Sequence, residues 1–267
     1  MIMQLITYSF FQRALIVGLL ITICSALLGV SLVLKRCSMI GDGLSHVGFG
    51  ALAIAAAFNL TPLYVAIPAV IIAAFVLLRF SEKSVKGDAA IALISSSALA
   101  IGIIAVSMTT GMNVDVNNYM FGSILALNSS DVILTVILSI VIITAYVLLY
   151  HRIFSVTFDE AFATATGINS RLYNSVIAVL TAVTVVLGMR MMGALLISSL
   201  IIFPALSSMR VFKTHRGVMV SSLIIAIVCF FSGMYLSANL GIPSGATIVV
   251  VNLFVFIAAA LIKKATN

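Results

Sequence analysis

The chain has 267 residues, of which 63% are hydrophobic and only 8% are charged, and its mean hydropathy is +1.31. An ordinary soluble domain carries about 25% charged residues, so this composition excludes a soluble fold. The net charge of +7 comes without a dense basic patch and interleaved aromatic residues, which argues against nucleic acid as a partner. The three cysteines lack CxxC spacing, which argues against a disulfide framework or a thiolate zinc site.

Several apolar runs reach the roughly 20 residues that cross a hydrocarbon core about 30 Å thick. We therefore expect an all-α, polytopic helical membrane protein, with residues 1–267 forming a single transmembrane domain in the lipid bilayer. Charged and turn residues bound nine predicted spans. The second span is short and rich in glycine, so eight spans with a broken second segment is the alternative. The nine ranges are 13–34, 43–58, 62–80, 89–110, 131–150, 172–189, 192–209, 217–236 and 246–262.

The basic residues predict the orientation, because loops on the cytoplasmic side are enriched in lysine and arginine. If the loop after the first span is cytoplasmic, 12 of the 14 lysines and arginines lie inside, and only Arg13 and Arg190 lie outside. Nine spans then place the N-terminus outside and the C-terminus inside, whereas eight would move the N-terminus. Arg190, between the sixth and seventh spans, fits an interface anchor and a gating residue equally well.

Asp42 and His46, near the start of the second span, are the acid and the histidine of this sequence that fall closest to membrane-embedded chain. Four residues apart on a helix, they project from the same face, one turn apart. A charged aspartate within a bilayer costs about 2.5–3.5 kcal/mol on insertion scales, so such a residue is a functional candidate. Two interpretations are open, an ion route through both side chains or a helix cap at Asp42 with a packed His46.

One carboxylate and one imidazole are fewer ligands than a metal ion needs, since zinc takes about four and manganese prefers more oxygens. A two-fold homodimer would bring two such pairs together and supply four ligands. Cys37 is a conceivable soft ligand, although an ordinary buried thiol is the more conservative interpretation.

The remaining acids all lie in loops or at span ends, which argues against a carrier driven by protons or sodium ions. No GxxxxGK[ST] motif occurs, so the chain has no phosphate-binding loop of its own. The sequence therefore predicts that energy comes from a separate chain.

The longest cytoplasmic loop contains a predicted short helix at about 157–167. Thr157 and Glu160 form a T-x-x-E capping box, and Gly167 is placed to end the helix. Four positions spaced i, i+3, i+4 and i+7 form an apolar face. This face could lie on the lipid surface, but its acidic polar side favours docking on a cytoplasmic partner. The candidate docking residues are Phe158, Asp159, Glu160, Ala161, Phe162 and Gly167, with Ala165 completing the apolar face.

A polar stretch on the outer side is the last candidate site. It either receives a delivery protein or is a solvated loop, and its candidate residues are Asn113, Asp115, Asn117 and Asn118.

Four stretches, taken together and in this order, resemble the permease subunits of ATP-binding-cassette (ABC) importers for zinc, manganese and iron(II). The most specific is Val33–Gly50 (VLKRCSMIGDGLSHVGFG), which is similar to the family signature L-x-R-x-S-L-x-G-D-A-L-S-H. Gly43 stands where alanine is usual, while Asp42 and His46 match. The other three stretches are Tyr119–Leu125, Phe158–Ile168 and Gly241–Thr247.

The resemblance implies a homodimeric, multi-pass permease in the cell membrane of a prokaryote. It implies a cytoplasmic ATPase and an extracytoplasmic metal-binding protein as partners, with Asp42 and His46 binding the ion and 158–167 coupling to the ATPase. Zn²⁺, Mn²⁺ or Fe²⁺ is then cargo, no cofactor is bound permanently, and the chain is not itself an enzyme. The alternatives are a secondary metal carrier without an ATPase, an ABC permease for a chelated-metal solute and, least favoured, an integral-membrane enzyme.

Overall fold

The computed structural model describes residues 9–83, 87–108 and 129–266. Within these ranges the chain is built from helices and contains no strand, and nine of the helices are long and apolar enough to cross a membrane. This confirms the predicted all-α membrane fold and favours nine spans over eight. The described helices are α2 (Ser9–Leu34), α3 (Met39–Ala57), α4 (Pro62–Lys83), α5 (Gly87–Ser107), α7 (Ser129–Leu148), α8 (Tyr150–Phe158), α9 (Glu160–Ala165), α10 (Ser170–Met192), α11 (Ala194–Val211), α12 (His215–Leu240) and α13 (Ser244–Thr266).

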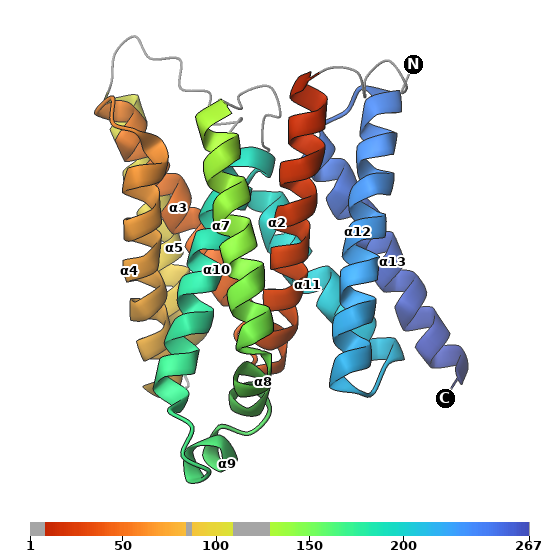
Figure 1. The fold of residues 1–267 in the computed structure, drawn as a ribbon. Coiled ribbons are helices and arrows are strands. Elements are labelled where there is room, and N and C mark those ends of the chain that lie inside the picture. The colour runs from red at the N-terminus through yellow and green to blue at the C-terminus, as the bar shows by residue number, and fades with distance from the viewer. Residues whose placement is uncertain (1–8, 84–86, 109–128, 267) are drawn as a thin grey trace.

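The long helices form one bundle, and the short helices α8 and α9 project from one end of it (Figure 1). α2 begins at the opposite end, and α13 ends on the side of α8 and α9. An odd number of spans produces this arrangement, because each span carries the chain to the other face. With the orientation that the basic residues predict, α8 and α9 are cytoplasmic.

α2 is the central helix of the bundle. It packs against α7, α10, α11 and α12, and 72% of its span is buried within the chain. By contrast, only 11% of the α5 span is buried, so most of α5 faces away from this chain. The first span is therefore held mainly by protein, and the fourth span is free to meet lipid or another subunit.

Small residues allow the helices to approach closely, as expected where lipid provides no hydrophobic force between spans. A Cβ built on Gly29 of α2 would lie 2.1 Å from the carbonyl oxygen of Ile201 in α11. A Cβ on Gly50 of α3 would lie 2.5 Å from the carbonyl oxygen of Ala98 in α5. In both places the neighbouring backbone occupies the space that a side chain would need.

Several buried hydroxyl groups find hydrogen-bond partners inside the bundle, as is favourable where a bilayer supplies no water. Thr22, Thr181 and Thr184 each donate to the carbonyl four residues earlier in their own helix. Ser31 of α2 and Tyr146 of α7 share a hydrogen bond of 2.8 Å between their hydroxyl oxygens. The last contact fixes the central helix to its neighbour by a polar bond as well as by packing.

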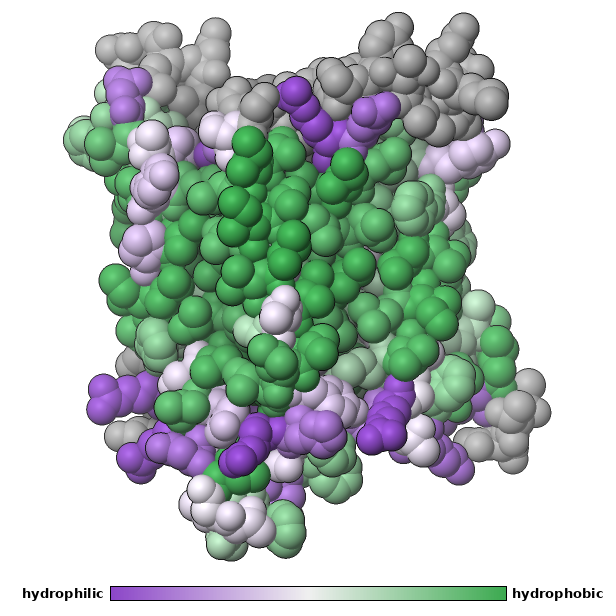
Figure 2. Space-filling model, in the orientation of Figure 1, coloured by the Kyte–Doolittle hydropathy of each residue, from purple (hydrophilic) through white to green (hydrophobic). Residues whose placement is uncertain are grey.

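Figure 2 shows an apolar band across the near face of the molecule, with hydrophilic residues gathered at its two ends. This distribution matches a bilayer core between two aqueous interfaces. The second span, expected to be short or broken, is a continuous helix of 19 residues. It begins at Met39, four residues before the predicted start at residue 43, and this places Asp42 inside the helix.

Candidate metal site and cytoplasmic helix

Asp42 and His46 lie side by side on α3. The distance between Asp42 Oδ2 and His46 Nε2 is 3.7 Å, and their side chains are 42% and 27% exposed in the single chain. Ser38 is the N-cap of α3, and its side chain makes no capping hydrogen bond. The interpretation of Asp42 as a helix cap is therefore wrong, because its carboxylate faces another side chain rather than the free N–H groups of the helix start.

A third polar group reaches this pair from α11. Ser198 Oγ donates to Asp42 Oδ1 at 3.2 Å and is also 3.3 Å from the carbonyl oxygen of Ala194. Ser198 is 156 residues from Asp42 in the sequence, and nothing in its local sequence marks it as part of the site. The structure thus joins α3 and α11 at the candidate metal site.

Chemically, the pair presents a carboxylate oxygen and an imidazole nitrogen on one face, with a hydroxyl group behind the carboxylate. These are nitrogen and oxygen donors of the type that bind zinc and manganese. Over the described residues, no group of three His, Cys, Asp or Glu side chains could hold a metal ion. Cys37 therefore does not join Asp42 and His46, and its Sγ instead donates to the carbonyl oxygen of Lys35.

The cytoplasmic segment folds differently from the predicted single helix at 157–167. It forms two helices, α8 and α9, separated by Asp159, whose backbone is extended with φ −147° and ψ 99°. The Asp159 side chain accepts a hydrogen bond of 2.9 Å from the Phe162 backbone N–H and so caps α9. The predicted Thr157–Glu160 capping box is wrong, because Thr157 lies within α8 and is buried there.

The end of α9 follows the prediction. Gly167 has a φ of +84°, the left-handed conformation that glycine adopts most easily after a helix. Its N–H donates to Thr164, and the N–H of Ile168 donates to Ala163 at 2.9 Å. This pair of bonds is a Schellman motif, which confirms Gly167 as the stop.

The predicted apolar face is open to solvent in the single chain. The side chains of Phe158 and Phe162 are 75% and 64% exposed, and Ala161 and Ala165 are exposed as well. Phe158 comes from the end of α8, so the face spans both short helices. Figure 1 shows α9 at the tip of the molecule, beyond the ends of the long helices.

Glu160 does not point freely into solvent with Asp159. Its carboxylate accepts a hydrogen bond of 3.1 Å from Asn174 Nδ2 of α10 and lies 3.9 Å from Lys35 Nζ. The candidate docking residues Asn113, Asp115, Asn117 and Asn118 lie outside the described residues.

Comparison with known proteins agrees with this architecture. The model of the ABC 3 transport family matches residues 7–263. The zinc uptake membrane protein ZnuB of Haemophilus influenzae is 28% identical over 246 residues, which cover 91% of this chain and 94% of that protein. The manganese transport membrane protein MntC of Listeria monocytogenes is 29% identical over 258 residues, covering 96% and 92%.

A solved structure has the same fold. A chain of PsaBC from Streptococcus pneumoniae, determined in complex with Fab, superposes with a TM-score of 0.85 and 25% identity over 97% of this chain and 95% of that one. The sequence match over nearly the full length and the shared fold lead to one assignment. This chain is a multi-pass membrane permease of the ABC 3 transport family.

Proposed function

We propose that the chain is the permease of an ABC importer that moves a divalent transition-metal ion into the cytoplasm. The observation that carries this proposal is the Asp42–His46 pair, which sets an oxygen and a nitrogen donor on one face of an otherwise apolar span. The relatives named for zinc uptake and for manganese transport support the same class of cargo. Iron(II) suits the same donors.

The pair supplies two ligands from each copy of the chain, so two copies related by a two-fold axis supply four. That number matches the ligand count of a zinc site. A site shared across an interface also opens when the two copies separate, which suits an ion that must be released after binding. Asp42 and His46 are half-exposed in the single chain, as this arrangement requires.

The ATPase is a separate cytoplasmic chain in this proposal, and α9 with the end of α8 is its docking element. Phe158 and Phe162 present aromatic surface to the cytoplasm without a partner surface in the described part of this chain. An amphipathic helix laid into a groove is a common mode of protein recognition. ATP hydrolysis belongs to the partner.

The proposed cycle is alternating access. A metal-binding protein delivers the ion at the outer end, and its expected docking residues Asn113, Asp115, Asn117 and Asn118 follow the fourth span in the sequence. Closure of two ATPase subunits then moves α9, and the spans rearrange so that the ion passes from the outer mouth to the Asp42–His46 pairs and on to the cytoplasm.

The test is uptake by the complex of permease, ATPase and binding protein in proteoliposomes, with zinc, manganese and iron(II) in competition. The double variant Asp42→Ala with His46→Ala is expected to lose uptake while the complex still assembles. Asp88→Ala, which removes an exposed acid at the start of α5, is the matched control and is expected to transport normally. Normal uptake by the double variant would disprove the site, and uptake insensitive to ATP would favour a secondary carrier.

A further inference from the structure

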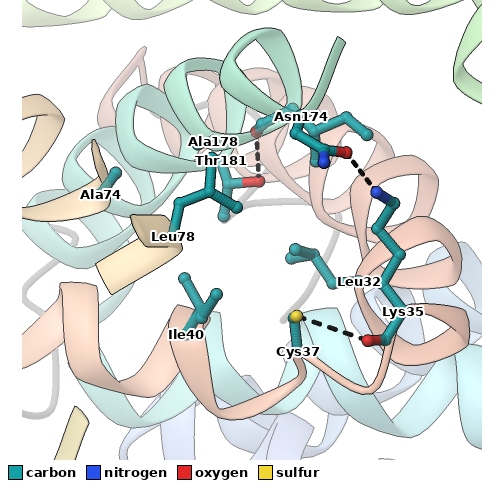
Figure 3. A pocket seen from close by; sticks show the side chains of 10 residues that line it. Leu32, Lys35, Cys37, Ile40, Ala74, Leu78, Asn174, Ala178 and Thr181 are labelled. Atoms are coloured by element: carbon teal, nitrogen blue, oxygen red, sulfur yellow. Dashed lines mark hydrogen bonds between the residues drawn. The ribbon is translucent and has the colours of Figure 1, made fainter. Parts of the chain in front are cut away.

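Three polar side chains meet where the cytoplasmic ends of α2 and α10 approach the start of α9. Asn174 of α10 lies between the other two, with its Oδ1 accepting from Lys35 Nζ and its Nδ2 donating to Glu160 Oε1 at 3.1 Å. Lys35 Nζ also lies 3.9 Å from Glu160 Oε2. Figure 3 shows Lys35 and Asn174 turned toward each other across the space between their helices. We call these residues the Lys35–Asn174–Glu160 triad.

The triad is not an ordinary surface ion pair, which would contribute little. Asn174 is 4% exposed and the Lys35 side chain 15%, whereas Glu160 is 50% exposed. Lys35 and Asn174 border a small cavity of about 20 Å³ whose other walls are largely apolar, including Leu32, Ile40 and Leu78 (Figure 3). Hydrogen bonds in such surroundings are stronger than in water, and the network loses correspondingly more when one member is removed.

α9 is tied to α10 by more than the triad. Thr164 and Ser170 share a hydrogen bond of 2.7 Å between their hydroxyl groups, and Ser170 Oγ lies 3.3 Å from the Glu160 carbonyl oxygen. A displacement of α9 therefore carries the start of α10 with it. Lys35 is the member of the triad that extends the connection to α2.

From Lys35 the chain leads directly to the candidate metal site. A tight turn follows α2, in which the N–H of Cys37 donates to Leu32 and Arg36 has a φ of +58°. α3 begins at Met39, and Asp42 lies in its first turn. Only a few residues therefore separate the ammonium group that contacts α9 from the carboxylate proposed to bind the ion.

We propose that the Lys35–Asn174–Glu160 triad couples movement of α9 to the Asp42–His46 pair, with Lys35 and Asn174 acting as positioning residues. This inference rests on the proposed function, because it presumes that an ATPase moves α9. The triad passes the movement to the end of α2, and the turn after α2 passes it to the first turn of α3. Without the triad, α9 still docks on the ATPase and the ATPase still hydrolyses ATP, but the movement of α9 no longer reaches the Asp42–His46 pair.

The measurement is the number of metal ions transported for each ATP hydrolysed by the reconstituted complex. Lys35→Gln and Asn174→Ala are each expected to lower this ratio about tenfold, in the range of couplings within one hydrogen-bond network. Arg36→Gln is the matched control, because it removes a neighbouring, exposed cation of the same turn and is expected to keep the wild-type ratio. Co-elution of permease and ATPase reports assembly, and Asn174→Ala, which leaves all charges in place, decides the test where Lys35→Gln fails to assemble.

A charge exchange separates coupling from mere folding. Lys35→Glu alone is expected to lower the ratio at least tenfold, and Lys35→Glu with Glu160→Lys is expected to restore it to within about threefold of the wild type. Asn174 supports the exchange, because its amide carries both a donor and an acceptor and can turn to serve the reversed pair.

Wild-type ratios in Lys35→Gln and Asn174→Ala would overturn the inference, as would a double exchange that still co-elutes with the ATPase but transports no better than Lys35→Glu alone. These outcomes are distinct from a failure of the proposed function, in which the wild-type complex itself shows no ATP-dependent metal uptake.

Discussion

Arg190 at the end of α10 forms an ion pair with Asp131 at the start of α7, with 2.6 Å between Nη2 and Oδ2. The two side chains are 17% and 15% exposed, so protein covers most of both charges. Arg190 therefore joins two spans, and this contact does not decide between the membrane-interface anchor and the gating residue that the sequence left open. The pair joins these spans at the end of the bundle opposite α9.

Breaking this pair from one side is expected to destabilise the permease. Arg190→Met leaves the Asp131 carboxylate without its partner in a largely buried position, and we expect a loss of about 2–3 kcal/mol in the free energy of unfolding. The measurement is unfolding of the purified permease in detergent, with exposed Asp88→Asn as the control. Arg190→Met with Asp131→Leu is expected to recover part of the loss, whereas additive effects of the two substitutions would contradict the interaction.

A second prediction concerns Ser198, whose hydroxyl group donates to Asp42. Groups that orient a metal-binding side chain typically change affinity 10- to 100-fold when they are removed. We therefore expect Ser198→Ala to weaken metal binding by the permease about tenfold while its thermal stability changes little. Metal titration by calorimetry measures this effect.

Ser199→Ala is the matched control for Ser198→Ala. Ser199 lies next to Ser198 on α11, but its hydroxyl group donates to the carbonyl of Leu196 within the same helix. Equal affinities for the two variants would show that Ser198 has no part in metal binding.

A third prediction addresses the exposed apolar face of α8 and α9. Phe162→Ala is expected to weaken binding of the ATPase by roughly 30-fold, about 2 kcal/mol, as for an aromatic residue at the centre of an interface. Because Phe162 is 64% exposed, its removal leaves the unfolding of the isolated permease unchanged. Leu172→Ala, an exposed apolar residue at the cytoplasmic end of α10, is the control, and an equal loss for both variants would contradict a localised docking face.

The lengths of the apolar runs predicted the spans, because every helix that crosses the bilayer needs about 20 mainly apolar residues. The same reasoning could not determine where α3 begins. Asp42 and Gly43 looked like the edge of a span, but the helix extends back to Met39 through residues of mixed polarity. The candidate pair was identifiable from its spacing of four residues, whereas Ser198 comes from another helix that only tertiary packing brings near.

The cytoplasmic segment shows the limit of local rules. Thr157 was predicted as the cap because Glu160 follows it at the spacing of a capping box, but Asp159, two positions later, is also a residue type that caps helices. Packing decided the outcome, because Thr157 is buried in α8 while Asp159 adopts the extended backbone of a cap. Glu160 was expected on a solvated face, and its contacts with Lys35 and Asn174 depend on segments more than ten residues away in sequence.

The last prediction tests the close approach of α3 and α5. Gly50→Ala would place a Cβ 2.5 Å from the carbonyl oxygen of Ala98, and backbone on both sides leaves no flexible group to yield. We expect Gly50→Ala to lower the free energy of unfolding by about 2 kcal/mol, since overpacking of this kind typically costs about 1–3 kcal/mol. Gly41→Ala on the same helix meets only the side chain of Ile201, with Cδ1 at 3.1 Å and Cγ2 at 3.8 Å, and a side chain can rotate where backbone cannot. Alanine also has a higher helix propensity than glycine, which adds up to about 1 kcal/mol to the free energy of unfolding. Gly41→Ala is therefore expected to be neutral or stabilising. Unfolding of both variants in detergent, titrated with a denaturing surfactant, measures the difference, and equal stabilities would show that α3 and α5 are not in backbone contact at Gly50.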